Sequence, residues 1–218
     1  MLQVDLHAHT RRSHDAWTSP RDFVRRAAMV GLDRVAVTDH GTLRGALEAR
    51  EHDPERVIVG EEIHCRERLD LIGLFLSRHV PDGLSARETA DRIREQGGVV
   101  YAPHPFAYLV RPRWKASVVL ALADVVEVFN ARAFVPSWNR DARAAARERG
   151  LPAAGSSDAH FVWEIGRART CLPEFTDVAG FRAALAQARP CDTLRTTPLV
   201  HAGSISLLVL RLGRRRHP

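Results

Sequence analysis

The chain has 218 residues, 45% of them hydrophobic, which is enough for one sizeable core and fits a single-domain barrel. Its net charge of +6 is concentrated near the C-terminus, where four arginines follow residue 210 and no acid lies between Leu199 and Pro218, so the rest of the chain carries only about +2. With 6% aromatic residues and no basic stripe interleaved with aromatics, the composition argues against an extended nucleic-acid-binding surface.

The three cysteines, Cys65, Cys171 and Cys191, are widely spaced and form no C-x-x-C pattern. An odd number of scattered cysteines is typical of a reducing compartment, so we expect a cytoplasmic protein rather than a disulfide scaffold. Asp5 and two histidines stand where a signal peptide would have its apolar segment. The apolar run 205–212 is too short to span a bilayer. We expect it to form a terminal helix packed on the domain, and binding to an anionic membrane surface is the alternative.

Predicted strands and helices alternate along the chain. Strands are predicted at residues 4–6, 34–38, 56–60, 70–76, 99–102, 125–129 and 152–155. Helices are predicted at residues 20–30, 42–49, 85–96, 118–123, 136–149 and 178–188, with serine or proline at several starts and glycine at several ends. This alternation predicts an α/β fold in a single domain, most simply a closed or nearly closed βα barrel.

Histidines and acids follow five of the predicted strands. His7 and His9 alternate at the end of the first strand, so both side chains point the same way. In βα barrels the sites form at these strand ends. The residues at such positions are His7, His9, His40, Glu62, His104, Asp158 and His160. Other histidines are interpreted as surface residues (His52, His79 and His217) or left open (His64 and His201).

This set of imidazoles and carboxylates exceeds the four ligands of one tetrahedral zinc ion and contains no thiolate. It favours a cluster of Zn, Mn or Fe. Two such ions about 3.5–4 Å apart can hold the attacking and leaving oxygens of a phosphoryl displacement and acidify a water between them to hydroxide. Glu62 is our choice of bridging carboxylate, because each of its oxygens can face a different ion. No phosphate-binding loop, dinucleotide-binding glycine motif or nucleophile elbow competes with this chemistry.

Five short motifs, in this order, resemble those of the PHP (polymerase and histidinol phosphatase) family. They are Asp5-Leu6-His7-Ala8-His9-Thr10, Thr38-Asp39-His40, Gly60-Glu61-Glu62-Ile63, Pro103-His104-Pro105 and Ser157-Asp158-Ala159-His160. The resemblance implies a distorted (β/α)7 barrel that holds two or three divalent metal ions and usually hydrolyses phosphoesters. We expect this domain to cover residues 1–190, with residues 191–218 as a C-terminal extension that carries the basic tail.

The resemblance also implies a role for individual residues. One metal is held by His7, His9, Glu62 and Asp158, a second by Glu62 and His104, and a third by Asp15, His40 and His160. Asp70 stands where some members have a histidine, so it either ligates the second metal, which would favour Mn or Fe, or supports the ligands. Glu61 is the alternative to Glu62. Catalysis is assigned to Glu62, Asp158 and His160, together with Arg132 and Arg167.

Arginine suits the binding of substrate phosphate. Arg132 and Arg167 lie on loops at the expected face, and Arg12 is a third possibility. Asn130 is a candidate for orienting ligands or substrate, and Asp39 for supporting a histidine. The segment 107–116 is a candidate lid over the site.

We therefore predict a metal-dependent phosphoesterase that acts on a small phosphomonoester or a nucleotide. The alternative is a 3′–5′ exonuclease or another oligonucleotide-degrading enzyme, for which the basic tail is a weak argument. A metal-dependent amidohydrolase is less well supported, because the single lysine, Lys115, lies in a predicted loop. A domain whose metals only stabilise the fold would be expected to lack some ligands. The sequence leaves the substrate, the metal and the oligomeric state open.

Overall fold

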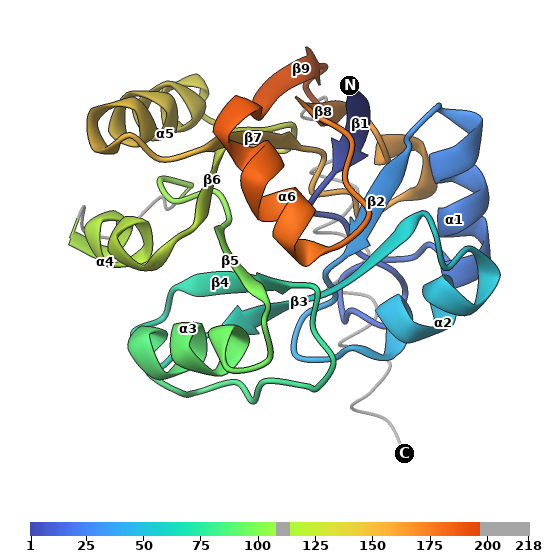
Figure 1. Cartoon of the computed structure of the whole chain (residues 1–218), viewed down its shortest axis with the longest axis horizontal. Helices are drawn as coiled ribbons and strands as arrows, with labels where there is room; N and C mark the ends of the chain where they lie inside the picture. Colours follow the sequence, from blue (N-terminus) through green and yellow to red (C-terminus); the bar gives the residue numbers. More distant parts are fainter. Residues whose placement is uncertain (108–113, 197–218) are drawn as a thin grey trace, which may run out of the picture.

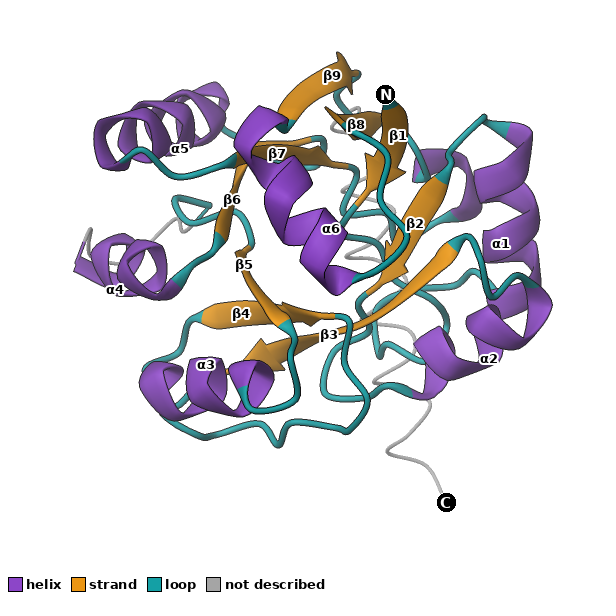
Figure 2. Cartoon of the chain, in the orientation of Figure 1, coloured by secondary structure: helices purple, strands orange, loops and turns teal. Residues whose placement is uncertain are grey.

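The computed structural model describes residues 1–107 and 114–196, and these form a sheet with helices around it (Figures 1 and 2). Nine strands make up the sheet: β1 (Leu2–Asp5), β2 (Arg34–Val37), β3 (Val57–His64), β4 (Asp70–Leu74), β5 (Val99–Ala102), β6 (Val125–Asn130), β7 (Ala153–Ser156), β8 (Ala168–Leu172) and β9 (Arg189–Thr193). Within the same residues the α-helices are α1 (Pro20–Met29), α2 (Arg44–His52), α3 (Ala86–Arg94), α4 (Trp114–Leu122), α5 (Pro136–Arg149) and α6 (Val178–Ala184).

The first seven strands are neighbours in chain order, and β8 and β9 continue the sheet beyond β1. The pairs β1–β2, β2–β3, β5–β6 and β6–β7 are parallel, whereas β4 is antiparallel to both of its neighbours. The Thr170 hydroxyl of β8 hydrogen-bonds to the backbone N–H and carbonyl of Gly155 in β7, at 3.0 and 2.9 Å, and so joins the two sides of the curved sheet. The predicted distorted (β/α)7 barrel is confirmed.

Two apolar layers stabilise the barrel. The outer layer lies between the strands and the helices, where residues such as Phe23 of α1 and Ile93 of α3 are buried. The inner layer fills the barrel and includes Leu6, Tyr101 and, from α6, Phe181. In Figure 1 α6 lies across the middle of the ring of strands, so its apolar side chains close one end of the barrel.

Local signals in the sequence explain most of the helix boundaries. The Ser19 hydroxyl accepts the backbone N–H of Asp22 at the start of α1, and Pro20 occupies its first turn. At the start of α3, Ser85 and Glu88 form a reciprocal capping box. Strand β3 runs further than predicted, to His64, because its second half pairs with β4. The apolar segment at 70–76 was correctly predicted to pair beside it.

The spacing of the cysteines predicted a reducing setting rather than a disulfide scaffold, and it gave no sign that two of them pair. Cys171 of β8 and Cys191 of β9 form a disulfide, with 5.6 Å between their Cα atoms, while Cys65 is a buried free thiol. Neither β8 nor β9 was predicted, so nothing in the sequence placed two cysteines 20 positions apart side by side. The antiparallel pairing of these strands brings them together.

No helix within residues 1–107 and 114–196 combines the length and the hydropathy needed to cross a membrane. The predicted terminal helix at 205–212, the basic tail and most of the candidate lid lie outside the described residues.

Candidate metal centre

The predicted ligands converge at one end of the barrel, beyond the carboxyl ends of the parallel strands. Isolated bridges continue the parallel pairing past the strands, between Ala8 and Ala159 and between His40 and Glu62. The backbone N–H of Asp158 donates to the His7 carbonyl at 2.8 Å. Segments that are more than 150 positions apart in sequence are thereby held side by side, and the ligands have a fixed backbone frame.

The first group of ligand atoms has nearly tetrahedral spacing. The Nε2 atoms of His7 and His9 lie 3.1 Å apart, and they lie 3.1 and 3.4 Å from Glu62 Oε2. Asp158 Oδ1 is 3.5 Å from the first of these nitrogens and 3.3 Å from the second. Four ligands about 2.0–2.1 Å from a central ion would be about 3.4 Å apart, so the spacing fits a tetrahedral divalent cation.

The orientation of His7 also fits a metal ligand. Its Nδ1 lies 3.1 Å from Glu127 Oε1, and because a carboxylate only accepts hydrogen bonds, Nδ1 must be the donor. In the neutral ring the lone pair of Nε2 then faces the other electron-rich atoms of the group. A carboxylate that holds the remote nitrogen of a histidine is a common support for metal ligation.

The second group lies next to the first and shares Glu62. His104 Nε2 is 3.5 Å from Glu62 Oε1, whereas the other glutamate oxygen, Oε2, faces His7 and His9. His7, His104 and Asp158 also have ligand atoms within 4.8 Å of one another. The two oxygens of Glu62 therefore point to different groups, as a bridging carboxylate requires.

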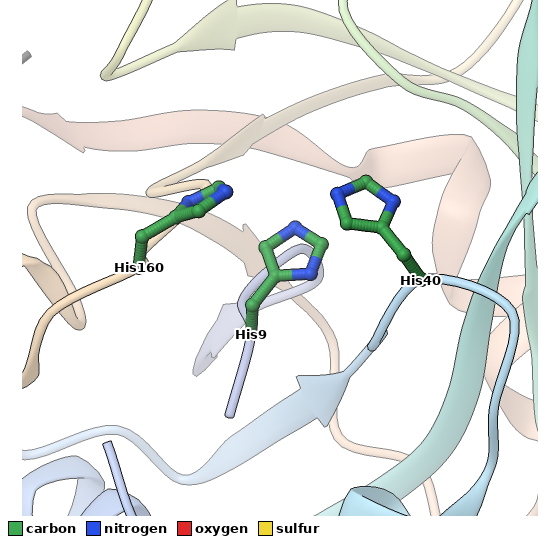
Figure 3. A group of neighbouring side chains, drawn as sticks. All are labelled: His9, His40 and His160. Atoms are coloured by element: carbon green, nitrogen blue, oxygen red, sulfur yellow. The ribbon is translucent and has the colours of Figure 1, made fainter. Parts of the chain in front are cut away.

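The third group contains His9, His40 and His160, whose rings approach a common space in Figure 3. Asp15 Oδ2 lies 3.0 Å from His160 Nε2 and 3.5 Å from His40 Nε2. The His160 Nδ1–H donates to the Asp158 carbonyl, so the lone pair of a neutral ring faces Asp15. The other carboxylate oxygen of Asp15, Oδ1, is buried without a hydrogen-bonding partner among the described residues. This site also fits a cation.

The charges of the histidines and carboxylates in the three ligand groups compensate one another, as the shifts in their pKa values show. Burial lowers the pKa of His9 to about 3, with help from the neighbouring His160. Burial also opposes the charged form of His40, yet the carboxylates of Glu62 and Asp15 outweigh it and raise that pKa to about 10. Despite burial, the charged histidines hold the pKa of Glu62 well below its ordinary value. The centre therefore exposes anionic oxygens to whatever cation it holds.

Two of the candidate ligands have an unusual backbone conformation. His104 has φ of 24° and Asp158 has φ of 51°, in the region that residues other than glycine rarely adopt. Such strain persists where the surrounding structure imposes it, and it is concentrated at functional sites. Here it turns both side chains toward the metal groups.

Other predicted residues lie around this centre or away from it. Asp70 Oδ1 is 2.6 Å from His64 Nδ1 beside the turn of the β3–β4 hairpin, and Asp70 belongs to none of the ligand groups found in the described residues. Glu61 points to the opposite side of β3 from Glu62 and is bound by His79 at 2.6 Å, which leaves Glu62 as the inward glutamate. Asp39 accepts hydrogen bonds from Thr10 and so fixes the segment that follows His9.

The three candidate arginines differ in position. Arg132 donates through Nη1 to both carboxylate oxygens of the buried Glu164, at 2.7 and 2.9 Å, and lines a cavity of about 250 Å³ beside the ligands. Arg167 donates to the Arg195 carbonyl at 3.0 Å, and Arg12 pairs with Glu48 on the surface. Neither lines that cavity. Its other residues include His104, Asn130, Asp158 and His160.

Glu127 is the functional residue that the sequence interpretation missed. It is 1% exposed and accepts hydrogen bonds from His7, from the Tyr101 hydroxyl, from the His104 backbone and from the Asn130 amide. The available signal was a single acid within the apolar strand 125–129. A buried carboxylate in such a strand needs several donors, and here these donors belong to the metal centre.

Comparisons with known proteins identify the family of the chain. The PHP domain family matches residues 5–111, and the PHP-associated family matches residues 136–190. The chain is 38% identical to the uncharacterized protein MJ1587 of Methanocaldococcus jannaschii over 143 residues, which are 60% of this chain and 82% of that protein. The chain therefore belongs to the PHP family.

Solved structures share the fold at low sequence identity. A two-domain protein of Bacteroides vulgatus that contains a predicted PHP-like metal-dependent phosphoesterase has a TM-score of 0.73 at 19% identity, with 88% of this chain and 65% of that chain covered. The chain thus spans less than two thirds of that protein. Endonuclease Q of Pyrococcus furiosus, a lesion-specific endonuclease, has a TM-score of 0.58 at 15% identity, with 87% of this chain and 57% of that chain covered.

Proposed function

We propose that this protein is a metal-dependent phosphoesterase that hydrolyses a small phosphomonoester or a nucleotide. The observation that carries the proposal is the arrangement of three adjoining ligand groups around Glu62, beside a cavity lined by Asn130 and Arg132. Two or three divalent ions of Zn, Mn or Fe fit these ligands, because the donors are imidazole and carboxylate without thiolate. Glu62 would bridge the first two positions, and Asp15, His40 and His160 would hold the third.

When bound, divalent ions in such a site offset the charge of the phosphate and lower the pKa of the attacking water. The protein's own residues do the rest. Glu127 fixes His7, and the Asn130 amide donates to Asp158 Oδ2 at 3.1 Å, which keeps that carboxylate directed at the ligand group. Asp158 and His160 are thus held at the border between the ligands and the substrate cavity.

Arg132 is our choice for binding the substrate phosphate. Arg132 lines the cavity, and its guanidinium is positioned by the buried Glu164, which also accepts the backbone N–H groups of His160 and Phe161. A guanidinium held in place loses little conformational freedom when it binds an anion. Arg167 is a weaker candidate, because it is directed toward Arg195. Asp70 stays a prediction, with a supporting role through His64 favoured by their contact.

The proposal is tested by phosphate release from p-nitrophenyl phosphate, mononucleotides and sugar phosphates, with Mn²⁺, Zn²⁺ or Fe²⁺ added to the metal-depleted protein. Activity should require metal and should be lost in His7→Ala and in Asp158→Ala. His52→Ala, at the exposed end of α2, is the matched control and should keep wild-type activity. Unchanged rates in both ligand variants would refute the proposal, and a metal-loaded protein that is silent on the whole panel would favour a structural role for the metals.

The second candidate is a nuclease, which the shared fold with endonuclease Q favours. Incubation with an end-labelled oligonucleotide, single-stranded or duplex, distinguishes a nuclease from an enzyme that acts on small phosphomonoesters. Shortening or internal cutting of the oligonucleotide without hydrolysis of mononucleotides supports the nuclease. Hydrolysis of mononucleotides with the oligonucleotide left intact supports the small-substrate enzyme.

A further inference from the structure

A second cavity lies beside the metal centre, between α1 and the short 3-10 helix at Val162–Glu164. We call it the Trp17–Trp163 pocket. Its volume is about 700 Å³, and its lining includes Trp17, Thr18, Arg26, Phe161 and Trp163. None of these residues belongs to the ligand groups described above.

The pocket is connected to the centre through the backbone. The N–H of Trp17 donates to the carbonyl of His160 at 3.0 Å, and Phe161 directly follows that histidine. Trp17 also stands two positions after Asp15, and two residues of chain span at most about 7 Å. A substrate whose phosphate lies among the ligands therefore has the pocket within the reach of its remaining part.

The pocket presents aromatic faces. The rings of Phe161 and Trp163 are stacked, with centroids 4.8 Å apart and an interplanar angle of 7°. Phe161 is 7% exposed, whereas Trp163 is 50% and Trp17 is 42% exposed. Indole rings left this open beside a cavity are suited to stack on a flat ligand, since stacked aromatic rings attract one another beyond the burial of their area.

Two residues that line the pocket have polar atoms without a hydrogen-bonding partner among the described residues. Thr18 is 5% exposed, and its hydroxyl is buried without a hydrogen-bonding partner among residues 1–107 and 114–196. The Nε–H of Arg26 is also buried without a hydrogen-bonding partner among these described residues. Buried donors and acceptors are nearly always paired in folded proteins, so two such atoms in residues that line one cavity favour an occupant that carries hydrogen-bonding groups. A plain phenyl group would leave both unsatisfied.

A flat ring with donors and acceptors on its edge is the chemistry of a nucleobase. We propose that the Trp17–Trp163 pocket binds the base of a nucleotide whose phosphate is hydrolysed at the metal centre, an inference that rests on the proposed phosphoesterase function. Trp163 and Trp17 stack on the base, and the Thr18 hydroxyl and the Arg26 Nε–H bind its polar edge. The pocket thereby selects nucleotides over phosphoesters that have no base.

The test compares kcat/KM for the four common ribonucleoside 5′-monophosphates with kcat/KM for ribose 5-phosphate, which lacks the base. For Trp163→Ala and Trp17→Ala the value for the preferred nucleotide should fall by about 5-fold to about 150-fold, mainly through KM, because stacking on one base contributes that much. The value for ribose 5-phosphate should not change. Trp163→Phe should restore most of the loss, and Thr18→Val should weaken discrimination among bases.

Leu47→Ala is the control, since Leu47 is 48% exposed on α2 and lines neither of the two cavities. Equal losses on nucleotide and ribose phosphate, or no loss on either, would overturn the pocket assignment.

Calorimetric titration of the metal-depleted protein with the unphosphorylated nucleosides separates the two proposals. Binding that is weakened by Trp163→Ala supports the pocket even if the enzyme hydrolyses no phosphoester. Absence of nucleoside binding in an active phosphoesterase refutes the pocket and leaves the proposed function intact.

Discussion

The two ends of the barrel interior differ in chemistry. At the closed end, Phe175, Phe181 and Leu185 pack against apolar side chains of the strands, and no polar group is needed to hold them. At the other end, imidazoles and carboxylates crowd together at 3.0–3.5 Å. Tyr101 joins the two, with its ring in the apolar layer and its hydroxyl 3.1 Å from Glu127 Oε1. One end therefore stabilises the fold, and the other gathers imidazoles and carboxylates whose charges compensate one another.

Substitution of the bridging glutamate should give the largest effect at the polar end. Glu62→Gln keeps the size of the side chain but removes the charge that faces His7, His9 and His104. We expect kcat/KM for the best phosphoester to fall by at least about 10²- to 10³-fold, as when a group that stabilises the transition state is removed. Metal content, measured by elemental mass spectrometry, should fall with it. Wild-type activity in Glu62→Gln would show that the two groups do not share this residue.

A substitution at the closed end of the barrel should lower stability and leave activity unchanged. Phe181 is fully buried between Phe75 and Phe175, and Phe181→Ala leaves a cavity that should lower the free energy of unfolding by about 3–5 kcal/mol. Activity per folded molecule should stay near the wild-type value, because the Phe181 ring lies in the inner apolar layer and not among the candidate metal ligands. The checks are denaturant unfolding of the metal-depleted protein and kinetics at a temperature where the variant is folded. A selective loss of activity would mean that the two ends are coupled.

Glu127 lies between the closed end and the metal centre, so its substitution shows whether it supports metal binding or only the apolar core. Glu127→Gln keeps the shape but gives His7 Nδ1 a weaker acceptor or a competing donor. We expect the affinity for the metal to fall by about 10- to 100-fold, the usual effect of removing a carboxylate that supports a metal-bound histidine. A competition titration with a chelator of known affinity measures it. Unchanged affinity, with a loss of thermal stability alone, would place Glu127 with the structural core.

The pH dependence of metal binding has a defined sign. Burial disfavours charge on His104 and His40, but Glu62 raises the pKa of His104 to about 9, and Glu62 with Asp15 raises that of His40 to about 10. Both rings are therefore protonated near pH 7 in the metal-free protein, and each must lose its proton to bind a metal. Affinity should rise from pH 6 to pH 8 by about tenfold per pH unit for each proton released. Calorimetry in two buffers of different ionisation enthalpy counts the protons, and a count of zero contradicts the assignment.

The barrel and the ligand residues could be predicted because both leave a local signal. Strands such as 99–102 are short apolar runs between a glycine pair and a proline, and the histidines follow them directly. By contrast, β8 reads A-R-T-C-L and β9 contains a proline, so neither has the pattern of a strand. They exist because β8 pairs with the edge of β1, which is a tertiary effect. The disulfide was missed for the same reason.

Side-chain partners were less predictable than ligands. The loop position of Arg132 suggested a phosphate ligand, but its pairing with Glu164 depends on a turn 32 positions away. Asp15 follows the H-x-H motif without a helix or strand to direct it, so its place beside His40 and His160 was expected from the family resemblance alone. The Trp17–Trp163 pocket likewise joins two loops that the sequence separates by more than 140 positions.

Anomalous diffraction at the metal absorption edge, from crystals of the protein reconstituted with Zn²⁺ or Mn²⁺, tests the central claim most directly. The account predicts peaks at the open end of the barrel, with one of them about 2.0–2.2 Å from ligand atoms of His7, His9, Glu62 and Asp158. Peaks only at exposed residues such as His52, or no peak among these four side chains at full reconstitution, would contradict it.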